Sequence, residues 1–243
     1  MQSFFLWLLV IFSAGATMYF MTLGVFYLFR KYNIVDKPHL YPHEKHRAPL
    51  PYPGGVVLIL NILLWSPWIV YAVGDADIKK VTYVVIAGLL TTIVMAWDDQ
   101  RRTIPPLFRL IFQISLGVFF GMTAIKIGYL SNIFGGIIYL DQFNLLQYTV
   151  WGKTIYILPI IVTVMWYILV MNAINWSDNG KAMTSSVSLV TCIILAFLAI
   201  KLYLTDSSFA AQGNSIFVLS FLTILIPTIF VFWVFDIKRA CII

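Results

Sequence analysis

The chain has 243 residues, of which 61% are hydrophobic and only 11% are charged, and its mean hydropathy is +0.91. A soluble domain is nearer half apolar and a quarter charged, so the composition excludes an ordinary soluble globule and indicates an integral membrane protein. The net charge of +6 would suit nucleic acid, but the placement of the charges favours membrane topology and no nucleic-acid partner. We expect a single transmembrane domain, residues 1–243.

Seven apolar runs are long enough to cross a hydrocarbon core of about 30 Å. We therefore expect an all-α polytopic membrane protein of about seven helices, two of which contain prolines that membrane helices tolerate. The first run lacks the basic start of a signal peptide and is expected to stay in the protein. The predicted spans are Gln2–Phe29, Gly54–Val73, Val81–Trp97, Leu107–Ile125, Thr154–Met171, Ala182 to Ile200 or a little beyond, and Ser215–Phe235.

Two connecting segments differ from the others. Residues 30–53 are polar and contain five prolines, which forbid a long helix there. At their end, Gly54-Gly55 lets a helix start tight against a neighbour or lets the backbone approach a ligand, and we favour the packing interpretation. Residues 128–153 have apolar runs too short to span, which predicts short strands in a β-hairpin-like segment at the outer surface.

Lysine and arginine placement predicts the orientation. If the N-terminus is outside, five of the 16 basic residues lie in outer loops and the remaining 11 lie inside. The outer ones are Lys79, Lys80, Lys126, Lys153 and Lys201. The two cysteines, Cys192 and Cys241, have no metal-site spacing and are expected to be thiols without a disulfide.

With this orientation, five aspartates and two asparagines collect on the cytoplasmic rim. They are Asp36, Asp98, Asp99, Asp178 and Asp236, with Asn172 and Asn175. Two adjacent acids at the mouth of a span are costly unless a cation, a phosphate site or arginines pair with them. One acid alone is better explained as a helix cap or an ion pair, but the pair together with Asn-x-x-Asn-x-x-Asp favours a site.

The residue types on this rim indicate phosphoryl chemistry. Carboxylate and amide oxygens are hard ligands that suit Mg²⁺, and the ion would screen a diphosphate and stabilise charge at the transferring phosphorus. Further phosphate oxygens would be neutralised by Arg102, Arg109, Lys45 and His46. The sequence has no Walker-type glycine loop, which argues against ATP hydrolysis.

Three motifs, in this order, resemble a known family, the polyprenyl-phosphate N-acetylhexosamine-1-phosphate transferases (glycosyltransferase family 4). The motifs are Asp36-Lys37-Pro38 … His46-x-x-Pro49-x-Pro51-x-x-Gly54-Gly55, then Trp97-Asp98-Asp99 … Leu110-x-x-Gln113, then Asn172-Ala-Ile-Asn175-x-x-Asp178. The outer segment with Gly135-Gly136 also resembles the family's periplasmic hairpin. The proline-rich first loop is more similar to the N-acetylglucosamine branch than to the muramoyl-pentapeptide branch.

The resemblance implies a Mg²⁺-dependent enzyme of the plasma (inner) membrane with a cytoplasmic active face. It would transfer a sugar-1-phosphate from a UDP-sugar to undecaprenyl phosphate, release UMP, and serve cell-envelope polysaccharide synthesis, with a homodimer as a further expectation. The implied catalytic residues are Asp98, Asp99 and Asp178, the implied metal ligands are Asp99 and Asn175, and the implied substrate-binding residues are Asn172, Asn175, Arg102, Arg109, Lys45 and His46. One aspartate of the pair would lie near the metal, and the other would act on the lipid phosphate, either by deprotonation or through a covalent intermediate.

The chain departs from the family pattern at three places. In the first loop, His43-Glu44-Lys45-His46 stands where Arg-Lys-x-His is common in the family. Lys181 stands where the family has a second acid after its asparagines. Phe235-Asp236-Ile-Lys238-Arg239 resembles the segment leading into the family's Gly-Asp-x-Gly-Ser motif, which supplies another metal-binding acid, but the sequence stops just before that motif. We therefore expect a truncated member without its C-terminal spans and with little or no transferase activity from these residues alone. The alternative is a non-catalytic pseudoenzyme or a polyprenyl-lipid-binding membrane protein.

Overall fold

The computed structural model describes residues 2–33, 54–74, 77–101, 104–123, 125–132, 134–143, 147–150, 153–177, 182–206 and 208–241. The described part is mostly helical. Contacts within the chain divide it into two compact units, Met1–Arg102 with Ser177–Ile243, and Thr103–Trp176.

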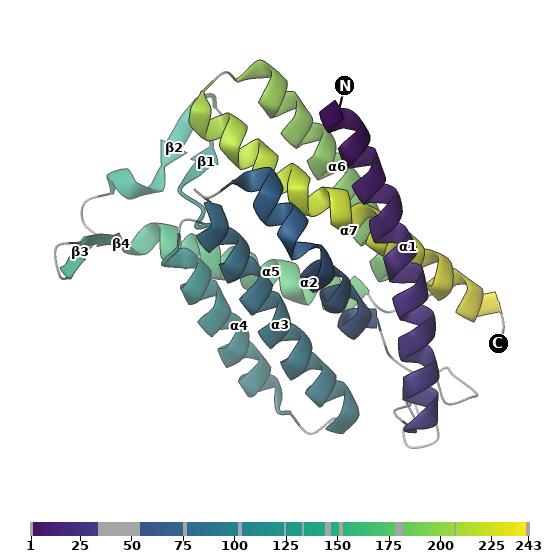
Figure 1. Cartoon of the computed structure of the whole chain (residues 1–243). Coiled ribbons are helices and arrows are strands. Elements are labelled where there is room, and N and C mark those ends of the chain that lie inside the picture. The colour runs from purple at the N-terminus through teal and green to yellow at the C-terminus, as the bar shows by residue number, and fades with distance from the viewer. Residues whose placement is uncertain are drawn as a thin grey trace. The chain divides into compact units, whose positions relative to one another are not determined.

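The first unit is a bundle of long apolar helices around α7. Its helices are α1 (Gln2–Lys31), α2 (Gly54–Val73), α3 (Ile78–Arg101), α6 (Met183–Thr205) and α7 (Phe209–Cys241). In this unit α7 runs beside both α1 and α6 (Figure 1) and also contacts α2. The core is apolar and consists of Val10, Ala14, Ile69, Val81, Phe221 and Ile224. α3 packs on α2, and the core joins α1, α2, α3 and α7 through aliphatic and aromatic side chains.

One fully buried asparagine links three of these helices. Asn61 of α2 donates its Nδ2 protons to the Ala14 carbonyl of α1 (3.1 Å) and to Thr228 Oγ1 of α7 (2.8 Å). Its Oδ1 accepts from Thr17 Oγ1 (2.7 Å), which also accepts from Trp65 Nε1 (3.0 Å). A polar side chain inside an apolar bundle is costly unless it is hydrogen-bonded, so this network fixes the register of α1, α2 and α7.

The start of α2 is packed tightly against α7. A Cβ added at Gly54 would lie 2.7 Å from Cε2 of Phe232, closer than real atoms approach, whereas a Cβ at Gly55 would meet nothing within 4 Å. Glycine is therefore needed at Gly54 so that the helix can begin beside the Phe232 ring. This confirms the packing interpretation for the first glycine of the pair.

The second unit combines two helices with two small hairpins (Figure 1). In chain order it contains α4 (Pro106–Gly121), β1 (Tyr129–Ser131), β2 (Ile137–Tyr139), η3 (Leu140–Gln142), β3 (Gln147–Val150), β4 (Lys153–Tyr156) and α5 (Ile157–Ser177, whose final residue belongs to the first unit). β1 pairs with β2 and β3 pairs with β4, both antiparallel. The hairpin-like segment is confirmed, but it is two hairpins and extends to Tyr156.

Two glycines let α4 pack directly against the backbone of α5. A Cβ at Gly117 would lie 2.9 Å from the Cα of Val164, and one at Gly121 would lie 3.0 Å from the Cα of Ile160. Because the later glycine of α4 meets the earlier residue of α5, the two helices are antiparallel. Small residues four apart allow such close approach between membrane helices.

We expect Gly117→Ala to lower the free energy of unfolding by about 1 kcal/mol, because the added methyl group meets backbone that cannot rotate away. Titration of the detergent-solubilised protein with sodium dodecyl sulfate, followed by circular dichroism, measures this. Gly24→Ala in α1 is the matched control, since a Cβ there meets nothing within 4 Å. Equal midpoints for both variants would contradict the packing argument.

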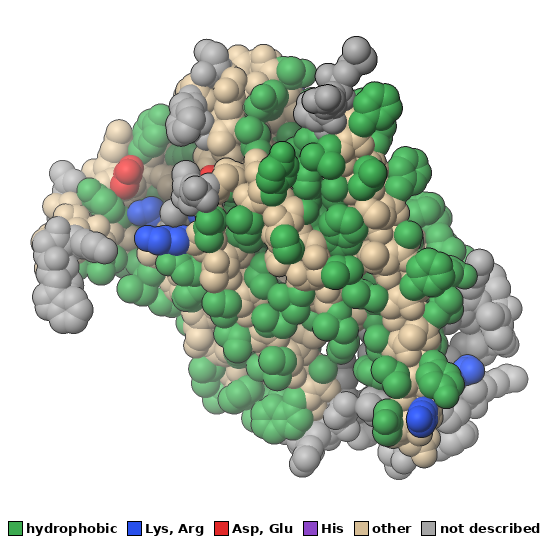
Figure 2. Space-filling model, in the orientation of Figure 1, with side chains coloured by type: hydrophobic (Ala, Val, Ile, Leu, Met, Phe, Trp, Pro, Cys, Tyr) green, Lys and Arg blue, Asp and Glu red, His purple; other side chains and the backbone are tan. Residues whose placement is uncertain are grey.

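The number of spans is corrected from seven to six. Within the described ranges, six helices are long and apolar enough to cross a membrane, which makes the chain a multi-pass membrane protein. The fourth predicted span, Leu107–Ile125, was wrong in length: α4 has 16 residues, about 24 Å, because it ends at Gly121. Figure 2 shows hydrophobic side chains covering the helices on the visible face, as lipid-facing helices require.

The bounds of the other spans also differ from the prediction. The fifth, Thr154–Met171, was wrong at both ends, because its first residues pair in β4 and the helix continues to Ser177. The sixth, predicted to end at Ile200 or a little beyond, ends at Thr205 in α6. The seventh was too short, because α7 covers Phe209–Cys241 with Pro227 inside.

The connection between α6 and α7 is polar and hydrogen-bonded. Asp206 Oδ1 accepts from the backbone N–H of Ser208 (2.9 Å), and this bond lowers the pKa of the Asp206 carboxyl group. Ser208 Oγ in turn accepts from the N–H of Ala211 (3.3 Å) in the first turn of α7. The serine therefore caps α7, which explains why the helix begins at Phe209 rather than at Ser215.

Candidate functional site

The acidic pair lies inside a helix, not in a loop. The prediction that the third span ends at Trp97, just before the pair, was wrong, because α3 continues to Arg101. No helix breaker occurs before Pro105, so the helix runs through both acids. The Asp98 side chain is only 5% exposed. A buried carboxylate at the end of a membrane helix requires compensating polar partners, which is the usual condition of a functional acid in such a position.

Several predicted site residues lie outside the described part of the chain. They are the side chain of Asp99, and Lys45, His46, Arg102 and Asp178. Lys181, where the family has a second acid, lies there too. Their roles remain predictions.

Two of the three motifs meet in the second unit. Asn172 of α5 donates from Nδ2 to Oε1 of Gln113 in α4 (2.9 Å) and to its own helix at the Ile168 carbonyl (2.8 Å). Gln113 is buried and lies one turn before Gly117 on the face that packs against α5. The glycine contact therefore brings the two amide side chains within hydrogen-bonding distance. Because both N–H groups of Asn172 donate, its Oδ1 is the atom left to accept a hydrogen bond or to coordinate a cation.

The other predicted site residues that are described in this unit, Asn175 and Arg109, lie on the same two helices. Asn175 occupies the last turn of α5 and is exposed, and Arg109 occupies the first turn of α4 and is half-buried. Arg109 precedes Gln113 by four residues and so shares its helix face. Asp98 belongs to the other unit, so the two parts of the expected site are carried by different units.

A second polar cluster lies at the start of α6 in the first unit. Ser185, which is buried, donates to Oδ2 of Asp236 in α7 (2.9 Å), and Trp233 Nε1 donates to Oγ of Ser186 (2.8 Å). A carboxylate beside a helix N-terminus is stabilised by the helix dipole. Asp236 was predicted to lie on the cytoplasmic rim, but its contact with Ser185 was not predicted. The run Thr184-Ser185-Ser186, which begins six residues after the last residue of the Asn-x-x-Asn-x-x-Asp motif, was the signal available.

The space beside Asp236 is too small for a nucleotide. The cavity lined by Thr22, Gly54, Phe232 and Asp236 holds about 10 Å³, room for about one water molecule. Asp236 and Ser185 thus act in the described part as a link between α6 and α7.

The described side chains do not form a carboxylate or histidine metal cluster. Among them, no three His, Cys, Asp or Glu residues come together. Their chemistry fits Mg²⁺ in kind, since Asp98 offers a carboxylate and Asn172 an amide oxygen. Comparison with protein-family models, with curated proteins and with solved structures finds no match to this chain.

Proposed function

We propose that this protein transfers a sugar-1-phosphate from a UDP-sugar to a polyprenyl phosphate and releases UMP. The sugar is N-acetylglucosamine, the lipid is undecaprenyl phosphate, and the reaction takes place at the cytoplasmic face of the plasma (inner) membrane for envelope polysaccharide synthesis. The observation that carries the proposal is the Gln113–Asn172 hydrogen bond (2.9 Å). It joins two of the segments on which the family resemblance rests, although they are 59 residues apart in sequence.

The reaction assigns a separate role to each group of predicted site residues. An oxygen of the lipid phosphate forms a bond to the sugar-bearing phosphorus, and that phosphorus loses its bond to UMP. One carboxylate of the Asp98-Asp99 pair acts on the lipid phosphate, and the other, with Asn175, holds the cation. Arg109, with Arg102, Lys45 and His46, neutralises phosphate oxygens. Asn172, fixed by Gln113, presents its Oδ1 to the nucleotide or the cation.

Mg²⁺ would screen the charge of the diphosphate and stabilise the charge at the transferring phosphorus. The residues that would hold it are Asp99 and Asn175, with Asp98 and Asp178 nearby in sequence. Hard oxygen donors of this kind are the ligands that Mg²⁺ prefers.

The test uses the protein reconstituted in vesicles that contain undecaprenyl phosphate. UDP-N-acetylglucosamine binding is measured by equilibrium dialysis with and without Mg²⁺, and UMP release is measured in parallel. The proposal expects Mg²⁺-dependent binding of the nucleotide sugar, with a low rate of UMP release. UDP-N-acetylglucosamine binding of equal affinity with and without Mg²⁺, or no binding at all, would contradict the proposal.

A second candidate function is polyprenyl-lipid binding without catalysis. It is favoured by an apolar cavity of about 310 Å³ between α1, α6 and α7 in the first unit, a volume suited to part of a hydrocarbon chain. Its walls include Trp7, Ile11, Ala196, Ile200, Leu222 and Ile226. In the same vesicles this candidate expects retention of the lipid with no binding of the UDP-sugar, which separates it from the transferase.

A further inference from the structure

The β1–β2 hairpin carries an unusually large set of exposed apolar side chains. They are Tyr129, Leu130, Phe134, Ile137, Ile138 and Tyr139. Phe134 is 97% exposed. Single exposed apolar residues are ordinary on a protein surface, but a contiguous apolar set marks a surface that meets a partner or a membrane.

Both faces of this hairpin are exposed. Tyr129 is paired with Tyr139, and the next pair along the ladder is Leu130 with Ile138. Successive residues of a strand point to opposite faces, so the tyrosine pair lies on one face and the aliphatic pair on the other. Because all four side chains are exposed, neither face is a core face covered by the described protein.

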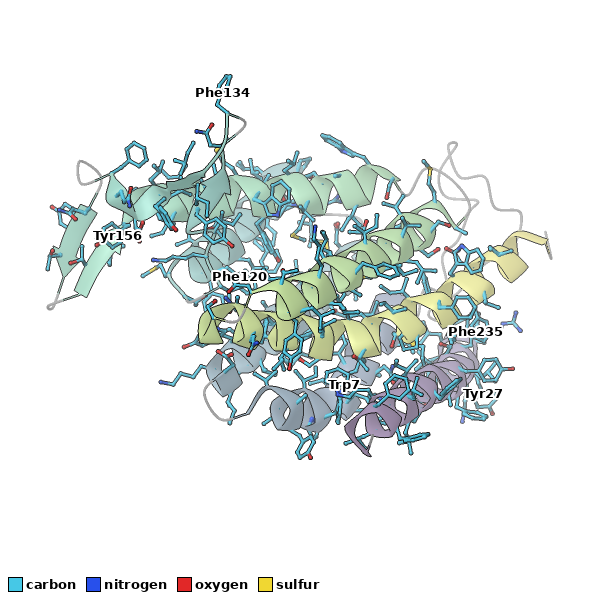
Figure 3. All side chains as sticks on the ribbon, turned by 90° about the horizontal axis from the view of Figure 1, so that it is seen from above. Trp7, Tyr27, Phe120, Phe134, Tyr156 and Phe235 are labelled. Carbon is cyan, nitrogen blue, oxygen red and sulfur yellow. The ribbon has the colours of Figure 1, made fainter. Side chains whose placement is uncertain are left out.

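The turn of the hairpin holds Phe134 outward. Oδ1 of Asn132 accepts from the N–H of Phe134 (3.0 Å), and the Asn132 carbonyl accepts from the N–H of Gly135 (3.0 Å). Gly135 and Gly136 have φ of +102° and +83°, which side-chain-bearing residues rarely adopt, so the glycines are needed to close the turn. Figure 3 shows Phe134 at the tip of the hairpin, directed away from the strands.

A hydrogen bond places the chain at the base of the hairpin beside a membrane helix, a short distance inward from the first residue of that helix. The N–H of Ile127 donates to Oγ1 of Thr163 (2.9 Å), and Thr163 lies six residues inside α5, which begins at Ile157. Six residues of helix correspond to about 9 Å along its axis. Since α5 is one of the membrane-spanning helices, the chain just before β1 lies at the level of the bilayer boundary.

Charge near the hairpin also suits a lipid surface. The Lys126 ammonium group lies over the Tyr156 ring, 5.7 Å from its centroid, at the junction of β4 and α5. Tyrosine and lysine side chains are typical of membrane interfaces, where the ring meets the acyl boundary and the ammonium group meets lipid phosphate. The described acidic group next to the hairpin is Asp141, which is exposed on η3 beyond β2.

We propose that the β1–β2 hairpin is an interfacial element that inserts Phe134 into the lipid of the bilayer that the helices of this chain span. Its occupant is that lipid, because the hairpin starts at the depth of the second turn of α5 and is apolar on both faces and at its tip. Burial in the acyl boundary removes from water the aromatic surface that the protein itself leaves uncovered.

The test places a nitrobenzoxadiazole label at a single cysteine in the full chain, reconstituted in phosphatidylcholine and phosphatidylglycerol vesicles. The natural cysteines are replaced (Cys192→Ala, Cys241→Ala), and the label is attached after Phe134→Cys. Ser208→Cys, in the polar α6–α7 connection, is the matched aqueous control. Fluorescence is quenched either by a nitroxide on the lipid chain or by iodide in the buffer.

The proposal expects severalfold stronger quenching by the lipid nitroxide than by iodide at position 134, and the reverse at position 208. Iodide quenching at 134 equal to that at 208 would overturn it. Protection from both quenchers would also overturn it, because a protein would then cover the hairpin. If Phe134→Cys does not yield folded protein, the same comparison after Ile137→Cys decides the question.

Discussion

Asp98→Asn is expected to weaken Mg²⁺-dependent binding of the UDP-sugar by about tenfold or more while leaving the fold intact. Asp98 adjoins Asp99, the proposed Mg²⁺ ligand, and loss of even an outer partner of a metal site typically costs about 10–100-fold in affinity. The substitution keeps the size of the side chain, and Asp98 is buried, so its packing is retained. Equilibrium dialysis at several Mg²⁺ concentrations measures the apparent affinity.

The matched control is Asp141→Asn, the same chemical change at an exposed carboxylate on η3. It should leave both nucleotide binding and stability unchanged. A purely structural role for Asp98 makes the opposite prediction: Asp98→Asn would then lower the unfolding midpoint and leave any nucleotide binding of the folded protein unaltered. Measuring both quantities on both variants distinguishes the two roles.

Asn61→Leu is expected to lower the free energy of unfolding by about 2 kcal/mol, because it removes three hydrogen bonds at roughly 0.6 kcal/mol each in a membrane interior. The loss is limited because the partner hydroxyl groups keep bonds to their own helices, Thr17 to the Ala14 carbonyl and Thr228 to the Ile224 carbonyl. The measurement is the sodium dodecyl sulfate midpoint, followed by circular dichroism.

Thr82→Val serves as the control for Asn61→Leu. The Thr82 hydroxyl is exposed and donates to the Ile78 carbonyl of its own helix, so its removal should change the midpoint little. If Asn61→Leu were as stable as Thr82→Val, the network would contribute nothing to holding α1, α2 and α7 together.

The sequence predicted the helices best where local chemistry fixes their ends. The bounds of α2, Gly54–Val73, agree with the prediction because Pro53 precedes the helix and Gly74, with φ of +76°, follows it. The membrane-protein class and the presence of a hairpin segment between the helices were also predictable. The start of α5 could not be predicted. It depends on the pairing of Lys153–Tyr156 with Gln147–Val150, and the hydrophobicity of the run does not show which residues pair in a hairpin.

The candidate site was predicted as a set of residue types rather than as a geometry. The contact between Asn172 and Gln113 depends on the close approach at Gly117 and Gly121, and helix pairing cannot be deduced from either motif alone. Asn61 was missed altogether. The signal was a single amide in the otherwise apolar run that becomes α2, a position where a polar side chain must find a partner within the bundle.

The Asn61 network also imposes an order of assembly during synthesis. Asn61 reaches Thr17 and Ala14 as soon as α1 and α2 are inserted, but Thr228 is made 167 residues later. Until α7 is synthesised, a nascent chain in which α1 and α2 are already paired leaves one side-chain N–H of Asn61 without its acceptor, the hydroxyl group of Thr228. α7 thus completes the polar network that α1 and α2 begin.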